Sequence, residues 1–379
     1  MVRREIARAR ERGDDTLQHQ LEREYQYDGV DTCAVDGMCQ TACPVLINTG
    51  DLVRRLRSEN QNSLAAAGWN AAARQWRTVS SMGGAALSAV KVLPSAVPHA
   101  ASVAARALLG TDNIPQYSAE LPGGGKPRPR LNSSEPFAVY FSSCTTTMFG
   151  PVGGDGVVDS LRNLCERADI QLRIPPDLRS LCCGTPWKSK GYTQGYALMC
   201  DRVASSLLRA TEEGRLPVVC DASSCTEGLQ VLFEAAELHS IRVLDAVEFV
   251  DEYVLPALPQ GNKVGAVTIH PTCSSTRLGI NASLLRVADA VADVVHVPDD
   301  WSCCAFAGDR GMLHPELTRS ATEREAEEIA ARETTAYASL NRTCELGMTR
   351  ATGQPYRHIL QLLDDATIGG ASERRESGC

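Results

Sequence analysis

The sequence predicts an α/β protein, with a helical N-terminal part followed by two pseudo-repeated α/β lobes that each contain a parallel sheet. Two observations predict this fold class. After residue 136, short β-branched and aromatic runs alternate with helical patterns, an order typical of parallel strands connected by helices. One cysteine pattern also occurs twice: a lone Cys after a predicted strand, an adjacent Cys-Cys pair about one helix later, and a closing Cys near a further helix. The repeat indicates a duplicated unit.

Length and composition exclude several classes of protein. With 379 residues, 43% of them hydrophobic, the chain can hold two or three domains with substantial cores. A net charge of -8 provides no broad basic field, so no nucleic acid partner is expected. Fifteen cysteines and a charged start without the apolar region of a signal peptide favour the reducing cytoplasm.

The N-terminal part is predicted to be mostly helical. Residues 3–25 form two charged helical pieces, residues 1–50 include a cysteine-rich loop, and residues 51–118 form an amphipathic helical connector. The stretch 82–110 is rich in Ala and Val but is interrupted by charged residues and prolines, so it is too polar to span a membrane. Packed helices are expected there, with contact to a membrane surface as the alternative. The Gly-, Pro- and Ser-rich stretch 119–136 is predicted to be a linker.

The two lobes are expected at residues 137–260 and 261–369, followed by a disordered tail at 370–379. In the first lobe, strands are predicted at 137–143, 170–174 and 216–222, with helices at 155–168 and 190–213. In the second lobe, strands are predicted at 264–271 and 294–298, with a helix at 315–333.

The repeated cysteines are candidate metal ligands, because they fall near the carboxyl ends of predicted parallel strands, where such sheets place their ligands. Converging thiolates bind iron-sulfur clusters or zinc, but adjacent cysteines suit an ordinary tetrahedral zinc site poorly. The first copy therefore predicts an iron-sulfur centre, and the second copy either another centre or an empty thiol pocket. The candidate ligands are Cys144, Cys182, Cys183, Cys220 and Cys225 in the first copy and Cys273, Cys303, Cys304 and Cys344 in the second.

This pattern, over about residues 135–365, resembles the cysteine-rich CCG domains found in heterodisulfide reductases, glycolate oxidase iron-sulfur subunits and lactate-utilisation proteins. The family pattern is a lone Cys, a Cys-Cys-Gly and a closing C-x-x-C. The first copy departs from it by closing with C-x4-C. The second copy has Ala305 where glycine is usual, and Gly347 where a last Cys would stand.

A further motif lies upstream. The run CAVDGMCQTACP (33–44) resembles half of a bacterial two-cluster ferredoxin, with Asp36 in place of the second Cys. The resemblance implies that Cys33 and Cys39 hold one centre, with Asp36 either a weak iron ligand or a solvated carboxylate. Cys43 would complete another centre whose remaining ligands lie in an earlier motif.

Taken together, the motifs resemble the C-terminal half of FAD-linked D-lactate dehydrogenases. The stretches that carry this resemblance are 33–57, 182–184, 270–279, 301–311 and 343–367. The resemblance implies electron transfer through 4Fe-4S clusters from FAD to a quinone or cytochrome, with the chain cytoplasmic or peripheral on the inner face of the membrane. No G-x-G-x-x-G follows a predicted strand, so FAD is expected on a missing domain or a separate subunit. No side chain of this chain is expected to act on the substrate.

Two other functions stay open. The CCG lobes of heterodisulfide reductases act on disulfides, so a thiol/disulfide redox enzyme is one alternative. A structural zinc protein or a metal-free docking fragment is the other. Among the remaining residues, Cys165 and Cys200 are expected to be buried thiols. His270 is expected to be structural or to hydrogen-bond a cluster sulfur, with metal ligation as the alternative. Trp187 and Trp301 are expected to shield a centre or simply to pack in the core.

Overall fold

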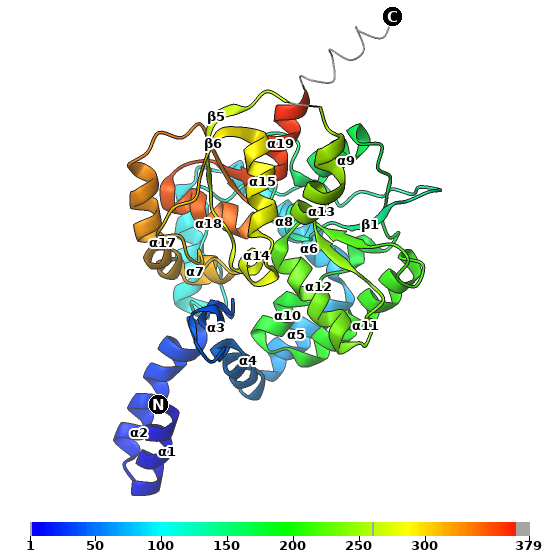
Figure 1. Ribbon diagram of the computed structural model, residues 1–379. Coiled ribbons are helices and arrows are strands. Elements are labelled where there is room, and N and C mark those ends of the chain that lie inside the picture. Colours follow the sequence, from blue (N-terminus) through cyan, green and yellow to red (C-terminus); the bar gives the residue numbers. More distant parts are fainter. Residues whose placement is uncertain (1, 260, 369–379) are drawn as a thin grey trace, which may run out of the picture.

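The computed structural model describes residues 2–259 and 261–368, and the tail predicted at 370–379 lies outside the described residues. It confirms the α/β class with two four-stranded parallel sheets, ordered β2-β1-β3-β4 and β6-β5-β7-β8 (Figure 1). The first sheet contains β1 (Ala138–Phe141), β2 (Leu172–Arg173), β3 (Val218–Cys220) and β4 (Val243–Asp245). The second contains β5 (Val264–Ile269), β6 (Ala292–His296), β7 (Ala336–Ser339) and β8 (Tyr356–His358).

Helices connect the strands of each lobe as the sequence predicts. All five predicted strands are present, whereas β4, β7 and β8 were missed because none of them contains a run of β-branched or aromatic residues. The first lobe contains α8 (Thr145–Met148), α9 (Val157–Arg167), α10 (Thr185–Lys190), α11 (Thr193–Ala210), α12 (Ser223–Ala235) and α13 (Ala246–Phe249). The second contains α14 (Cys273–Leu278), α15 (Asn281–Val291), α16 (Arg310–Leu313), α17 (Pro315–Ala330), α18 (Arg342–Thr352) and α19 (Ile359–Ile368).

The N-terminal part is helical, as predicted. Asp14 separates the two charged helices and caps the second, accepting a hydrogen bond from the backbone N–H of Leu17 at 3.0 Å. Figure 1 shows this pair of helices projecting away from the lobes. The elements are α1 (Val2–Arg12), α2 (Asp15–Tyr25), η1 (Gln26–Asp31), α3 (Met38–Ala42), α4 (Thr49–Glu59), α5 (Ser63–Arg74), α6 (Trp76–Lys91) and α7 (Ala96–Leu109).

Residues 119–136 contain no helix or strand, but their glycines serve close packing. A Cβ on Gly124 would lie 2.2 Å from the carbonyl oxygen of Gly84, so only glycine lets the two backbones approach this closely. Arg128 of the same stretch is buried and donates to the backbone carbonyls of Ser142 (3.3 Å) and Leu181 (2.9 Å). The segment therefore holds two loops of the first lobe in place.

The two lobes share one hydrophobic core. Buried side chains of both sheets form a single cluster, to which α15 and α19 of the second lobe contribute beside α9 and α13 of the first. An ion pair between Arg167 and the buried carboxylate of Asp364 crosses the junction, and Asn163 donates to the same carboxylate at 3.0 Å. The lobes are thus packed as one body rather than joined by a flexible hinge.

The buried carboxyl of Asp245, at the end of β4, should make the free energy of unfolding depend on pH. Burial raises the pKa of Asp245 from 3.8 to about 7, although Val247 N–H and the Thr226 hydroxyl donate to its oxygens at 2.9 and 3.0 Å. Between about pH 4 and 7 the folded state binds this proton more tightly than the unfolded state. The group's contribution to the free energy of unfolding therefore falls as pH rises through this window, by at most about 1.4 kcal/mol per pH unit.

Asp245→Asn keeps an acceptor oxygen and has no charge to bury. We expect its urea midpoint to exceed that of the parent at pH 8 and to match it near pH 4. An equal difference at both pH values would contradict the assignment.

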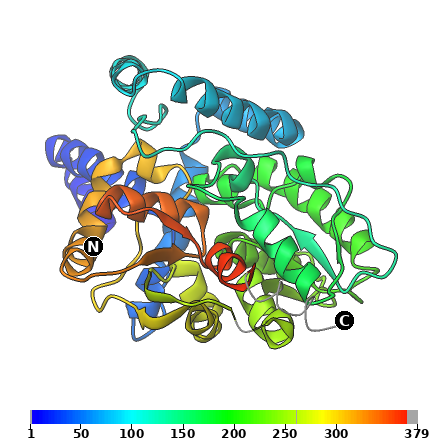
Figure 2. The same cartoon turned by 90° about the horizontal axis from the view of Figure 1, so that it is seen from above.

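No helix of the described residues is long and apolar enough to cross a bilayer. The stretch 82–110 forms parts of α6 and α7, and Figure 2 shows these helices along one edge of the molecule, outside the two lobes. Many of their apolar side chains face solvent: Met82, Val92, Leu93, Val97, Val103, Leu108 and Leu109.

Candidate metal centres

The first lobe brings its five candidate thiols together at the carboxyl ends of its strands. Cys144 follows β1 at the start of α8, and Cys220 is the last residue of β3. Cys182 and Cys183 lie in the loop that enters α10, where Gly184 adopts a left-handed φ of +84°. Cys225 is the third residue of α12. All five are at most 6% exposed, so the group is shielded from water.

The distances among these thiols show a compact group. The sulfur atoms of Cys144 and Cys182 are 3.8 Å apart, and those of Cys183 and Cys225 are 3.2 Å apart. Contacts with the thiols of Cys182 and Cys225 lower the pKa of Cys183 well below its ordinary value, because the Cys183 thiolate accepts hydrogen bonds from both thiols. The structure therefore joins three separated segments of the chain into one thiol-rich pocket.

The remaining buried thiol of this lobe behaves differently. Cys165 packs inside α9, where burial alone raises its pKa to about 12. No neighbouring thiol contributes to this shift, so Cys165 stands apart from the candidate ligands.

Aromatic side chains cover the approach to the first pocket. Trp187, fully buried after the Cys182-Cys183 loop, contacts the rings of Trp69 and Trp76 with centroids 6.0 and 4.8 Å apart. Cys144 also interacts with Trp76. Trp187 therefore packs in the core, and its role in shielding a centre stays a prediction. Trp301 is only half-buried.

The spacing to the following cysteines relates the two lobes position by position. Phe141, paired with Cys220 between β1 and β3, stands three residues before Cys144, and His270 stands three residues before Cys273, one residue beyond the last pair of β5 and β7. Ser339 stands five residues before Cys344, as Cys220 does before Cys225. Cys344 is the third residue of α18, as Cys225 is of α12. The donor missing from the second lobe is therefore the strand-end cysteine, and Gly347 does not mark the missing position as the motif had suggested.

The second lobe and the N-terminal loop form two groups of metal-binding donors. His270, Cys304 and Cys344 place one ligand atom each within 4.8 Å of one another, and all three are buried. Asp36, Cys273 and Cys303 do the same at a half-buried position. Among the described residues, no such group contains Cys33, Cys39 or Cys43.

Sequence reasoning placed Asp36 with the neighbouring Cys33 and Cys39. The structure instead brings its carboxylate to the thiols of the second lobe. The contact depends on how the N-terminal loop docks, which local spacing does not reveal.

One arginine fastens the N-terminal loop between the lobes. Arg277, on α14, donates to the carbonyl oxygen of Asp36 at 3.1 Å and forms an ion pair with Glu227 of α12 at 2.8 Å. A Cβ on Gly37, whose φ is +76°, would lie 1.9 Å from the guanidinium. The Asp36-Gly37 turn is thus shaped to receive Arg277.

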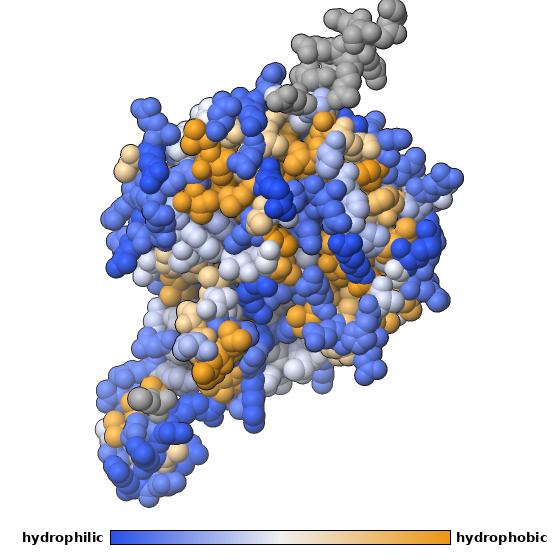
Figure 3. All heavy atoms as spheres, viewed as in Figure 1, coloured by the Kyte–Doolittle hydropathy of each residue, from blue (hydrophilic) through white to orange (hydrophobic). Residues whose placement is uncertain are grey.

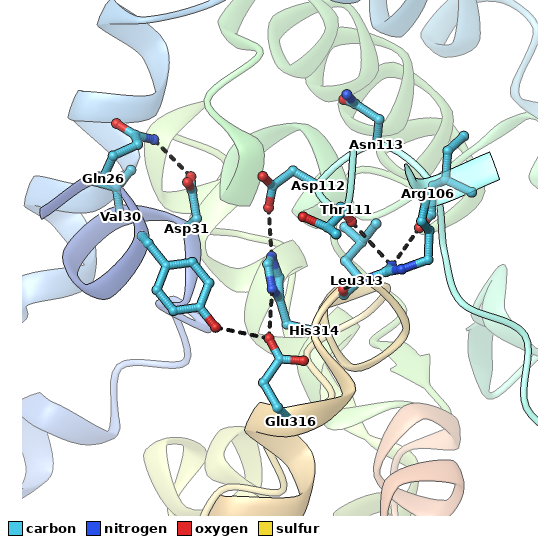
Figure 4. Close-up of polar contacts among 12 residues, drawn as sticks. Gln26, Val30, Asp31, Arg106, Thr111, Asp112, Asn113, Leu313, His314 and Glu316 are labelled. Carbon is cyan, nitrogen blue, oxygen red and sulfur yellow. Dashed lines mark hydrogen bonds and ion pairs between the residues drawn. The ribbon is translucent and has the colours of Figure 1, made fainter. Parts of the chain in front are cut away.

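A histidine missed by sequence reasoning makes the second anchor (Figure 4). His314 is buried, with Nε2 2.7 Å from a carboxylate oxygen of Asp112 and Nδ1 3.0 Å from one of Glu316. The hydroxyl of Tyr27, in η1, donates to Glu316 at 3.1 Å. This cluster joins the segment after α7 and the N-terminal part to the second lobe.

The ferredoxin-like segment itself is accessible. Cys33 and Cys43 are half-buried and Cys39 is exposed, while Thr49 donates to the sulfur of Cys39 at 3.2 Å. Its pKa is lowered, because hydrogen bonds from residues 49 and 50 outweigh its slight burial. Residues Val45, Leu46 and Ile47 follow with 58–70% of their area exposed, and Figure 3 shows hydrophobic side chains gathered near α3 and α4.

The buried pair His270–Glu325 lies behind the second lobe's thiols. Nδ1 of His270 is 2.7 Å from Glu325 Oε1, and both side chains are at most 1% exposed. Burial disfavours the imidazolium, but contacts with Cys304 and Glu325 outweigh it and raise the pKa of His270 to about 10. A contact with the Cys344 thiol, aided by His270, lowers the pKa of Cys304 to about 5 against the effect of burial.

Both lobes match a known protein family. Residues 138–230 and 267–349 each match the family described as "Cysteine-rich domain" (CCG). Lactate utilization protein A of Macrococcus caseolyticus (strain JCSC5402) is 29% identical over 184 residues, which cover 44% of this chain and 69% of that protein. Lactate utilization protein A 1 of Bacillus mycoides (strain KBAB4) is 26% identical over 257 residues, which cover 61% of this chain and 98% of that protein.

Proposed function

We propose that this chain, which carries two CCG cysteine-rich domains, is the iron-sulfur electron-transfer module of a lactate-oxidising system. It would accept electrons from the FAD of a D-lactate or related D-2-hydroxy acid dehydrogenase and pass them to a quinone or cytochrome. The observation that carries the proposal is the buried convergence of five thiols in the first lobe. The names of its relatives support lactate as the substrate class.

The donor set of the first lobe fits an iron-sulfur group. Five sulfur donors lie in this pocket. Among the described residues of this lobe, no three candidate ligand atoms lie close enough together to bind one metal ion. This spacing favours a centre with several irons over one zinc. Such a group would supply reversible one-electron storage. The chain's own residues hold the loops through Arg128, keep water out through Trp76 and Trp187, and stabilise the Cys183 thiolate.

We assign the contact with the electron-transfer partner to the ferredoxin-like segment. Cys39 is the exposed one among the candidate cysteine ligands, Cys33 and Cys43 are half-buried, and an exposed apolar turn at 45–47 adjoins them. Exposed apolar side chains beside a redox group suit a docking surface. The expected partner is a flavin-containing domain or subunit, and Asp36 joins this segment to the second lobe's thiols.

The test is anaerobic purification of the whole chain, with iron, acid-labile sulfide and zinc measured per polypeptide and EPR spectra of both redox states. The expected result is four or more irons with matching sulfide, and reduction of the chain by a lactate-reduced flavoprotein. Zinc alone would support the structural alternative and overturn the proposal. Disulfide reduction by the chain without a flavoprotein would support the heterodisulfide-reductase-like alternative, which the burial of the first lobe's thiols disfavours.

We further propose that α6 and α7 rest on an anionic membrane surface, on the cytoplasmic face where a quinone acceptor would lie. Val92 and Leu108 are 85% and 84% exposed, and residues 60–111 contain no Asp or Glu although the chain has 46. Lys91 and Arg106 donate to backbone carbonyls and form no ion pair with a carboxylate in the described part of the chain. An apolar ridge with uncompensated positive charge suits anionic lipid.

Val103→Glu with Leu108→Glu should weaken binding to phosphatidylglycerol-containing vesicles by about tenfold or more, because two apolar contacts are lost. Cosedimentation measures this loss, and Val294→Glu, at an exposed valine of β6, is the matched control. Equal binding by all variants, or concentration-dependent dimers in place of vesicle binding, would refute the membrane assignment.

A further inference from the structure

The second lobe lacks one of the first lobe's candidate cysteine ligands and has a histidine at the end of the neighbouring strand. Cys220 ends β3 in the first lobe, and the equivalent position at the end of β7 is Ser339. The partner of Cys220 across the sheet is the apolar Phe141, whereas Ser339 lies next to His270, one residue beyond the last pair of β5 and β7, and its hydroxyl donates to the His270 carbonyl. The second lobe thus has an imidazole one strand away from the place where the first lobe has its fifth thiol.

The surroundings of His270 orient its ring. The ring is fully buried, and Nδ1 lies 2.7 Å from Glu325 Oε1. The carbonyl oxygen of His270 accepts a hydrogen bond from the Ser339 hydroxyl at 2.9 Å, which fixes the backbone at the strand end. Nε2 is buried and forms no hydrogen bond of normal geometry within the described residues, and the Cys304 sulfur lies within 4.8 Å of the ring's ligand nitrogen. A metal ion shared with that sulfur would satisfy this buried nitrogen.

The thiols that face this nitrogen supply the rest of a site. A ligand nitrogen of His270 and the sulfur atoms of Cys304 and Cys344 all lie within 4.8 Å of one another. For bonds of about 2.0–2.3 Å, two ligand atoms on one tetrahedral zinc ion lie about 3.4–3.8 Å apart. Donors within 4.8 Å of one another therefore have to close by roughly 1 Å to bind a single ion. A carboxylate that accepts from the far ring nitrogen is the usual support of a metal-bound histidine.

We propose that His270, oriented by Glu325, is a metal ligand of the second lobe. It binds one divalent ion of the zinc or iron(II) class together with Cys304 and Cys344. The second centre is then a mixed nitrogen-sulfur site, chemically distinct from the all-thiolate centre of the first lobe. The inference deepens the metal-binding part of the proposed function and does not depend on electron transfer by the first lobe.

The test uses the full chain purified without oxygen, with metal counted per polypeptide and the coordination of zinc, after zinc loading, read by X-ray absorption. The parent is expected to hold one ion with nitrogen and sulfur neighbours. His270→Ala should lose this ion and keep the iron and sulfide of the first lobe. His270→Cys should keep the ion with sulfur neighbours alone. His296→Ala, at a half-buried histidine 3.4 Å from Glu328, should match the parent.

A parent site with sulfur neighbours only, or a His270→Ala variant with unchanged metal content and coordination, would overturn the inference. If His270→Ala does not fold, the change of neighbours in His270→Cys decides the question. Absence of iron in the first lobe with a nitrogen-sulfur ion in the second would overturn the proposed function and leave this inference standing.

Discussion

Replacing Cys183 and Cys225 together by serine should remove the iron and sulfide of the first lobe completely. The two sulfur atoms are 3.2 Å apart and come from different loops, so no neighbouring thiol can substitute for both. Serine hydroxyls are too weakly acidic to replace thiolates as soft ligands. Iron and acid-labile sulfide per chain, with the visible and EPR spectra, measure the loss, and the second lobe's metal should remain.

Cys165→Ser is the matched control for this experiment. It also removes a buried thiol of the first lobe, but one that stands alone in α9 with a pKa of about 12. Its metal content should equal that of the parent. If Cys183→Ser with Cys225→Ser retained the parent's iron, the first lobe's centre would have been assigned to the wrong residues.

Arg342→Met is expected to produce the largest loss of stability among changes outside the thiols, about 3–5 kcal/mol in the free energy of unfolding. Arg342 is 7% exposed and reaches from α18 to the first lobe, where it donates to the carbonyl of Gly150. It also forms an ion pair with the buried Glu345 at 2.5 Å. Burial raises the pKa of Glu345 although Arg342 opposes the shift, so removal of Arg342 leaves a buried carboxyl without its counter-ion.

The urea midpoint of each variant checks this prediction. Arg342→Met with Glu345→Met removes both charges and should recover part of the loss, since no unpaired charge remains. Arg286→Met is the comparison: it breaks an ion pair with Asp251 at 2.6 Å in which the Arg286 side chain is well exposed. It should lower the free energy of unfolding by about 1 kcal/mol or less. An effect of Arg342→Met no larger than that of Arg286→Met would contradict a structural role for the buried pair.

The duplicated fold was predictable because its signals are local. Alternating β-branched runs and helical patterns predicted five of the eight strands, and the cysteine spacing indicated the duplication. The structure confirms two parallel sheets. The three missed strands are short and take their place from neighbours on the sheet, not from their own residues. The composition of 119–136 was interpreted as that of a linker, and the structure shows that Gly124 and Gly125 also allow close backbone contacts.

The candidate site was predictable only in part. The thiols of each lobe were identified because cysteines at the carboxyl ends of parallel strands must converge. His270 was expected to be structural or a neighbour of a centre, with ligation as the alternative, because spacing alone does not show that Cys304 and Cys344 lie beside it. His314 carried no signal at all, since its two carboxylate partners come from separate segments.

The sequence by itself determined the fold class, the duplication and the identity of the sulfur donors, because periodicity and spacing act over a few residues along the chain. Only the tertiary structure decided which donors meet. It places Asp36 beside Cys273 and Cys303, and aims His270 at Cys304 and Cys344. The physical reason is that these contacts depend on the packing of distant segments, set by Arg277, the His314 cluster and the shared core, and no local pattern encodes that packing.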